Sequence, residues 1–174
     1  PNYFALSAEK LTPQRAISEL ARHYGAEYTE LARWLKDREH EKSQLDWALN
    51  INTRIVPGME NYVVYISDIA IKTGKTTTKY SLCFNIDPKT GRQITLKEVF
   101  GDDYNETLTK KIIAQMAKNN DWDDDDEAQA QSKGYFVGIK PYASQNFILY
   151  DDSTTFVYSP GEINKNEVRV TIEN

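Results

Sequence analysis

The sequence predicts an α+β fold: an antiparallel sheet with a long N-terminal helix and a second helix between two groups of strands. Three observations favour it. Apolar residues recur every three or four positions over residues 12–35, which is the period of a helix. Alternating patterns over residues 47–55 and 80–86 then mark strands. The strands follow one another through short turns without intervening helices, which is typical of an antiparallel sheet.

The N-terminal helix is predicted to begin at Thr12-Pro13, because threonine caps free amides and proline suits the first helical position. The charged residues 36–42 are expected to end it. Its apolar stripe consists of Ile17, Leu20, Tyr24, Tyr28, Leu31 and Leu35.

Three strands should follow this helix. The first, over residues 47–55, is predicted to bury one face, and the second, over residues 62–71, to be central because it is apolar on both faces. In the third, Cys83 falls on the polar-facing side. The predicted inward residues of the third strand are Tyr80, Leu82, Phe84 and Ile86. Asp87-Pro-Lys-Thr-Gly91 reads as a turn with Gly91 at positive φ.

A short return segment is expected from Ile94 to Phe100, and a second helix from Tyr104 to about Lys118. The inward residues of this helix are predicted to be Tyr104, Leu108, Ile112 and Met116. An acidic stretch follows at residues 121–127. The remaining strands are predicted at residues 135–139, 147–150, 155–158 and 168–172.

Length and charge restrict the class of protein. The 174 residues predict a single domain over 1–174, with the first helix and strand in 1–60. A net charge of −5 argues against a nucleic-acid partner and favours either a cationic partner or simply solubility. No apolar run is long enough to span a membrane. Because the chain begins at Pro1 without an initiator methionine, we expect a trimmed piece of a longer protein.

Residues 85–100 carry a family resemblance. NIDPKTGRQITLKEVF resembles the N-x-D-x-x-T-G-K-x-I-T-L-x-D-L-F stretch of DUF3298, the extracytoplasmic family that forms the outer part of the lysozyme-sensing anti-sigma factor RsiV. The family also accompanies some polysaccharide deacetylases and occurs in lipoproteins. Residues 146–152 and 156–163 are similar to its closing strands, so the resemblance covers roughly residues 61–174.

The chain departs from the family pattern at two places. Lys75-Thr76 stands where the family often has Ala-His, so any role of that histidine is absent here. Gly161 replaces the tyrosine before Glu162-Ile163, while a Pro-Tyr pair occurs earlier, at Pro141-Tyr142. The resemblance implies a non-enzymatic binding or sensing domain outside the cytoplasm, periplasmic or at the cell surface.

No motif in the sequence predicts catalysis, a cofactor or a metal site. The acidic stretch fails as a calcium loop, because the sixth and twelfth positions from Asp121 are Asp126 and Ser132 instead of glycine and glutamate. We therefore expect a solvated acidic loop with at most weak, unselective affinity for calcium. His23 and His40 have no third ligand for zinc in the sequence, and Cys83 has no neighbouring base.

The acidic loop is the candidate partner contact. Its members are Asp121, Trp122, Asp123, Asp124, Asp125 and Asp126. Trp122 is expected to be tucked against the second helix, because large aromatic side chains are mostly buried.

Three functions stay open from the sequence. The first is binding a cationic protein such as lysozyme, which fits the acidic charge and is implied by the resemblance. The second is a carbohydrate- or peptidoglycan-binding accessory module, which exposed aromatics in a shallow groove would mark. The third is a hydrolase with paired carboxylates, which a cleft with a shifted carboxyl pKa would mark.

Overall fold

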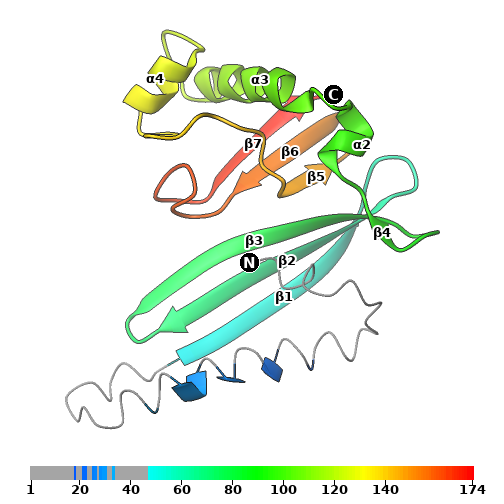
Figure 1. Ribbon diagram of the computed structural model, residues 1–174, viewed down its shortest axis with the longest axis vertical. Coiled ribbons are helices and arrows are strands. Elements are labelled where there is room, and N and C mark those ends of the chain that lie inside the picture. The colour runs from blue at the N-terminus through cyan, green and yellow to red at the C-terminus, as the bar shows by residue number, and fades with distance from the viewer. Residues whose placement is uncertain (1–17, 19–20, 23–24, 27, 31–32, 34–46) are drawn as a thin grey trace. The chain divides into compact units, whose positions relative to one another are not determined.

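The computed structural model describes residues 18, 21–22, 25–26, 28–30, 33 and 47–174, and its elements are drawn in Figure 1. The chain is divided into two compact units. One comprises residues 1–48 with 72–76, and the other residues 49–71 with 77–174. The prediction of a single domain stays a prediction. No helix of the described part is both long and apolar enough to cross a membrane.

The first sheet has four strands in the order β1-β2-β3-β4. They are β1 (Trp47–Pro57), β2 (Val63–Thr73), β3 (Thr76–Asp87) and β4 (Arg92–Gln93). β4 is only two residues long and pairs antiparallel with the end of β3, with Ile86 opposite Gln93. Most of that edge of β3 therefore has no strand partner within the described residues.

The second sheet is a three-stranded antiparallel meander, β5-β6-β7. Its strands are β5 (Phe147–Leu149), β6 (Ser153–Tyr158) and β7 (Val168–Glu173). Phe156 of β6 lies opposite both Phe147 and Val170, so the central strand is covered by apolar residues from either side. All three strands confirm the sequence prediction.

Three helices lie between the two groups of strands: α2 (Leu96–Phe100), α3 (Tyr104–Asn119) and α4 (Glu127–Ser132). α3 confirms the second predicted helix, and its inward residues are the predicted ones: Leu108, Ile112 and Met116 are buried, while Tyr104 is partly buried against the same core. Figure 1 shows α3 lying along the second sheet. The shared core contains Leu96, Leu108, Ile112, Met116, Phe136, Phe147, Leu149, Phe156, Tyr158 and Val170.

The turn between β3 and β4 follows from its sequence. The Asp87 carboxylate accepts hydrogen bonds from the Lys89 amide at 2.8 Å and the Thr90 hydroxyl at 2.9 Å. These bonds hold the pKa of Asp87 below its usual range. Gly91 has a φ of 69°, which confirms the predicted left-handed position.

Four expectations need correction. The strands form two sheets instead of one. Leu49 and Ile55 of β1 are 39% and 61% exposed, so β1 lacks the expected buried face. Residues 135–139 form turns, because Phe136 and Gly138 have positive φ. Residues 96–100 are the helix α2, which begins with a capping box between Thr95 and Glu98.

The polarity of β3 is also opposite to the prediction. Ser81, Cys83 and Asn85 are buried, whereas three of the four predicted inward residues, Tyr80, Leu82 and Ile86, are only partly buried. The fourth, Phe84, is buried as predicted. The polar side faces the second sheet and finds hydrogen-bond partners there.

The predicted N-terminal helix falls mostly outside the described residues, as do Ile17, Leu20, Tyr24, Leu31 and Leu35 of its stripe. The residues described between 18 and 33 are helical. Tyr28 is 40% exposed, and its ring contacts Trp47 edge-on at 6.0 Å. His23 and His40 also lie outside the described residues.

Candidate partner-binding loop and groove

The acidic loop, residues 121–126, is fixed at both ends. At its start the Trp122 amide donates to the carbonyl of Ala117 in α3, at 3.0 Å. The Trp122 ring packs on the core and lies 5.5 Å from the Tyr135 ring, which confirms that this side chain is tucked in. At its end Asp126 caps α4 by accepting a hydrogen bond from the Gln129 amide at 2.8 Å.

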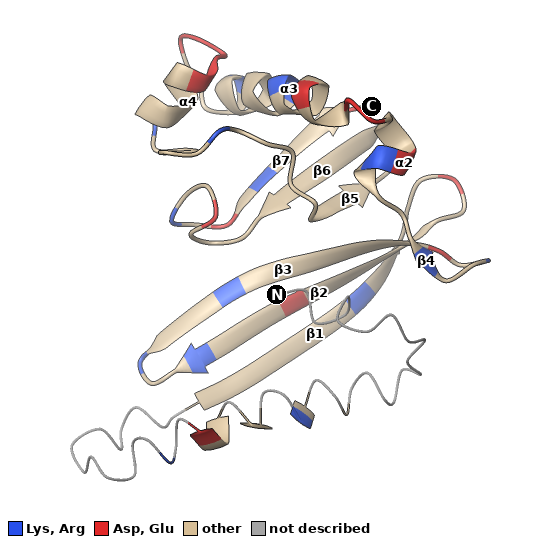
Figure 2. Cartoon of the chain, in the orientation of Figure 1, with Lys and Arg blue, Asp and Glu red and all other residues tan. Residues whose placement is uncertain are grey.

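Four carboxylates lie between these anchors: Asp121, Asp123, Asp124 and Asp125. All four are exposed, and none makes a hydrogen bond or ion pair with another described residue. Figure 2 shows the resulting concentration of acidic residues between α3 and α4. The loop therefore presents negative charge at a defined place on the second unit. Its contact with a partner stays a prediction.

A groove of about 780 Å³ runs beside this loop, along α3. We call it the α3 groove. Its lining residues are Asn105, Glu106, Thr109, Lys110, Lys111, Ile113, Ala114, Asp125, Asp126, Glu127, Lys140 and Pro141. The loop thus contributes two carboxylates to a concave surface, a connection that the sequence did not indicate because the lining comes from three separate segments.

Charge within the groove is partly paired. Lys110 donates to the Glu106 carboxylate at 2.8 Å, and this bond, with the nearby charge of Lys140, lowers the pKa of Glu106. Lys111 donates to the carbonyl of Glu173 at 3.2 Å. Glu127 accepts a hydrogen bond from Gln131 at 3.1 Å. Asp125 has no described partner.

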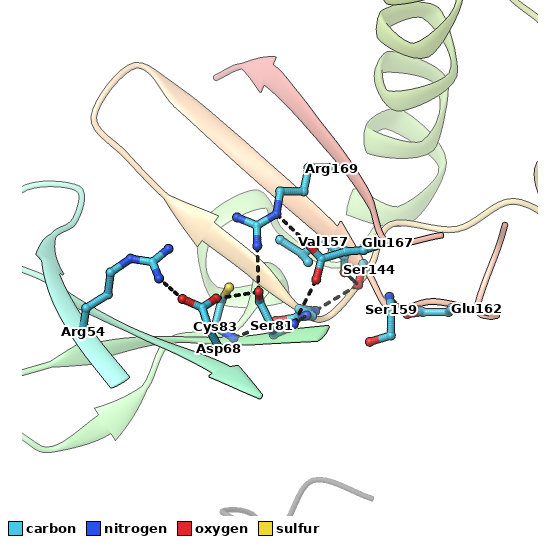
Figure 3. A network of polar contacts seen from close by, with 11 residues as sticks. Arg54, Asp68, Ser81, Cys83, Ser144, Val157, Ser159, Glu162, Glu167 and Arg169 are labelled. Carbon is cyan, nitrogen blue, oxygen red and sulfur yellow. Dashed lines mark hydrogen bonds and ion pairs between the residues drawn. The ribbon is translucent and has the colours of Figure 1, made fainter. Parts of the chain in front are cut away.

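A second cluster of charged residues lies where β3 meets β7 (Figure 3). The Ser81 hydroxyl donates to Asp68 and accepts from Arg169, both at 2.7 Å. Arg169 also donates to Glu167 at 2.8 Å, and Glu167 accepts from the Ser81 amide at 2.9 Å. Asp68 further pairs with Arg54 of β1. Each of these charges has an opposite partner.

The groups of this cluster bond to one another, and their pKa shifts do not favour reactivity. Burial alone would raise the pKa of Asp68, but the Ser81 hydrogen bond and the charge of Arg54 outweigh it and lower that pKa. Cys83 is buried, which raises the pKa of its thiol to about 11, so the thiolate needed for nucleophilic attack is scarce at neutral pH. Ser81 is buried too, and its hydroxyl donates to Asp68, whose pKa is lowered.

Two asparagines join the sheets next to this cluster. The Asn85 side chain donates to the Phe147 carbonyl and accepts from the Leu149 amide, both at 2.9 Å. In return the Asn146 side chain donates to the Ser81 carbonyl and accepts from the Cys83 amide, both at 2.7 Å. Each side-chain amide therefore makes the two backbone hydrogen bonds that a neighbouring strand would otherwise make. We call this contact the seam.

Sequence reasoning missed the seam, although Asn85 opens the motif that carried the family resemblance and Asn146 opens its later counterpart. The motif was interpreted as a turn followed by a strand. Its first residue instead satisfies the backbone of a strand about 60 positions away.

The two segments of the second departure, Pro141-Tyr142 and the loop that contains Gly161, are joined by hydrogen bonds. The Tyr142 hydroxyl donates to Glu162 at 2.6 Å, and Glu162 also accepts from the Ser159 amide at 2.7 Å. Burial and the neighbouring carboxylate raise the pKa of Tyr142. Tyr142 thus holds the loop of residues 159–162, which precedes Ile163, through its hydrogen bond to Glu162. No group of three His, Cys, Asp or Glu among the described residues is placed to hold a metal.

Comparison with known proteins places the fold. Residues 97–164 match the family model "Protein of unknown function (DUF3298)". A DUF3298 member from Bacteroides fragilis has a similar crystal structure: TM-score 0.74 and 24% identity, covering 95% of this chain and 67% of the other.

A DUF3298 protein from Pseudomonas aeruginosa is also similar, with a TM-score of 0.55 and 16% identity over 77% of this chain and 64% of the other. No curated protein matches the chain. Residues 97–164 therefore match the DUF3298 family model, and the fold is similar to that of two DUF3298 proteins.

Proposed function

We propose that this domain is a non-enzymatic binding domain that works outside the cytoplasm and recognises a cationic protein, such as lysozyme, through the acidic loop. The observation that carries the proposal is the contrast within residues 121–126. Trp122 and Asp126 are engaged in holding the loop, whereas the four other aspartates are exposed and unpaired.

The physical argument rests on repulsion between like charges. Four carboxylates within five residues repel one another, and nothing described on the chain neutralises Asp121, Asp123, Asp124 or Asp125. A cationic partner relieves that repulsion and is attracted over a distance of about one Debye length, roughly 10 Å at 0.1 M salt. Such attraction acts on the rate of association more than on the rate of release.

The other two functions have less support. Sugar-binding grooves use aromatic platforms, and the α3 groove has no aromatic residue in its lining. A carboxylate hydrolase needs a general acid with a raised pKa. Among the described residues, the carboxyl groups with a shifted pKa are Asp68, Asp87, Glu98 and Glu106, and all four are shifted downward. The extracytoplasmic location is inferred from the family resemblance.

The test is association kinetics with lysozyme, a strongly basic protein. The loop variant changes Asp121, Asp123, Asp124 and Asp125 to Asn and leaves Trp122 and Asp126 in place. We expect its association rate at low salt to fall roughly tenfold or more, with a smaller change in the rate of release. High salt should reduce the difference. The proposal is wrong if wild type binds lysozyme no better than the variant at low salt.

A further inference from the structure

We propose that the α3 groove receives a lysine or arginine side chain of the cationic partner. The inference rests on the proposed function, and it adds a specific binding site to long-range attraction. Three features of the groove support it: its concave shape, the apolar residues of its wall and the distribution of its charges.

The groove offers both parts that a basic side chain requires. Its wall includes the partly exposed Ala114 beside the buried Ile113 and Pro141, so the aliphatic stem meets apolar atoms there. Its acidic end is formed by Asp125, Asp126 and Glu127. Since Asp126 is occupied as a cap and Glu127 by Gln131, Asp125 is the carboxylate available to the incoming charge.

The lysines of the same groove set the opposing effect. Lys110 is paired with Glu106, and Lys111 is directed to the carbonyl of Glu173. Lys140 makes no hydrogen bond to a described side chain, although its charge acts on Glu106. A basic ligand is therefore repelled by Lys140 and by Lys111, neither of which has a carboxylate partner among the described residues, whereas an anionic ligand would need these charges. The sign of a Lys140 substitution separates the two kinds of ligand.

The wall of the groove also holds an unsatisfied group. The Thr109 hydroxyl is the one buried side-chain oxygen or nitrogen in the described part of the chain that lacks a hydrogen-bond partner. Such a group costs stability, and its retention calls for an explanation. We offer a ligand in the groove as the explanation, because the backbone amide groups beside a lysine side chain supply hydrogen-bond donors and acceptors. Thr109→Val should then keep the fold at least as stable while weakening the ligand.

The test uses N-acetyl-lysine methylamide as the probe, titrated into the labelled domain and followed by amide chemical shifts. We expect saturable shifts at Thr109, Ile113 and Ala114. Asp125→Asn should weaken the affinity about fivefold, as expected for one exposed ion pair. Asp123→Asn is the matched control: it removes the same charge from the same loop but not from the groove, and should change affinity less than twofold. Lys140→Gln should tighten binding.

The possible results distinguish failure of the groove site from failure of the proposed function. Equal effects of Asp125→Asn and Asp123→Asn, weaker binding in Lys140→Gln, or shifts confined to residues 121–126 would each overturn the groove site. None of these would affect the proposed function, which depends on the salt-dependent association of lysozyme with the whole loop. Loss of that association with the groove shifts intact would instead remove lysozyme as the partner.

Discussion

The seam and the acidic loop are both built from polar side chains, but they treat them in opposite ways. At the seam, Asn85 is 1% exposed and makes two hydrogen bonds to the backbone of β5. In the loop, Asp123, Asp124 and Asp125 are exposed and have no described partner. Polar groups that are buried must be satisfied within the fold, whereas exposed charges are available to another molecule.

The fold and the proposed binding function therefore depend on different residues of the domain. The seam replaces strand pairing along the open edge of β3, so it determines how the two sheets join. The loop is held by Trp122 and the Asp126 cap, so its other aspartates are not required for the fold. Substitutions at the two regions should therefore affect different measurements.

The largest effect is expected at the seam. Asn85→Ala leaves the Phe147 carbonyl and the Leu149 amide buried without partners, each at a cost of roughly 1–3 kcal/mol. We expect the free energy of unfolding to fall by about 3 kcal/mol in urea titrations. Asn119→Ala on the exposed end of α3 is the matched control, with a change within roughly 0.5 kcal/mol. Equal losses in the two variants would show that the seam does not hold the sheets.

A smaller effect is expected at the turn that leads from β3 to β4. Gly91 has a φ of 69° and open space around the position of a Cβ, so a side chain there meets backbone strain and no clash. Gly91→Val should lower the melting temperature, with a cost of roughly 1–2 kcal/mol. Gly91→Asn should cost less, because asparagine tolerates the left-handed region. Unchanged stability together with lost lysozyme association would assign this turn to the binding surface.

The smallest effect concerns pH and the cluster beside the seam. Because the folded state lowers the pKa of Asp68, its contribution is present above the ordinary value of 3.8 and is lost as pH falls through the lower folded value. The side chain is 40% exposed, so the contribution should stay below about 1 kcal/mol. Asp68→Asn should thus be slightly less stable than wild type at neutral pH.

Urea unfolding at several pH values checks this, because the two proteins should converge in stability at about pH 2–3, below the ordinary pKa of an aspartate. A difference that persists or grows in acid would mean that Asp68 is not a stabilising carboxylate in this cluster.

Patterns of local period predicted much of the fold. α3 and strands β5, β6 and β7 follow their apolar spacing because their neighbours in sequence are also the neighbours that they pack with. The capping box at Thr95 and Glu98 was readable as a helix start, but Ile94 and Leu96 were interpreted as the beginning of a short return segment. In residues 135–139, the apolar alternation was misleading because the backbone turns at Phe136 and Gly138.

The site was predictable only in part. The acidic loop is a local feature, so its residues and the burial of Trp122 could be inferred from the sequence. The polarity of β3 could not, because Asn85 is satisfied by the backbone of Phe147, 62 residues away, and Ser81 by Arg169, 88 residues away, as well as by Asp68 of the neighbouring strand. The α3 groove likewise brings Asp125 beside Lys140 and the exposed side of α3, a proximity created by tertiary packing.

One crossed comparison tests the central claim most directly: melting temperature and low-salt association with lysozyme, measured for the loop variant and for Asn85→Ala. We predict that replacing the four loop aspartates by Asn keeps or raises the melting temperature while association slows roughly tenfold or more. Asn85→Ala should lower the melting temperature while the molecules that remain folded associate at the wild-type rate. A loop variant that unfolds more easily and associates as fast as wild type would contradict the account.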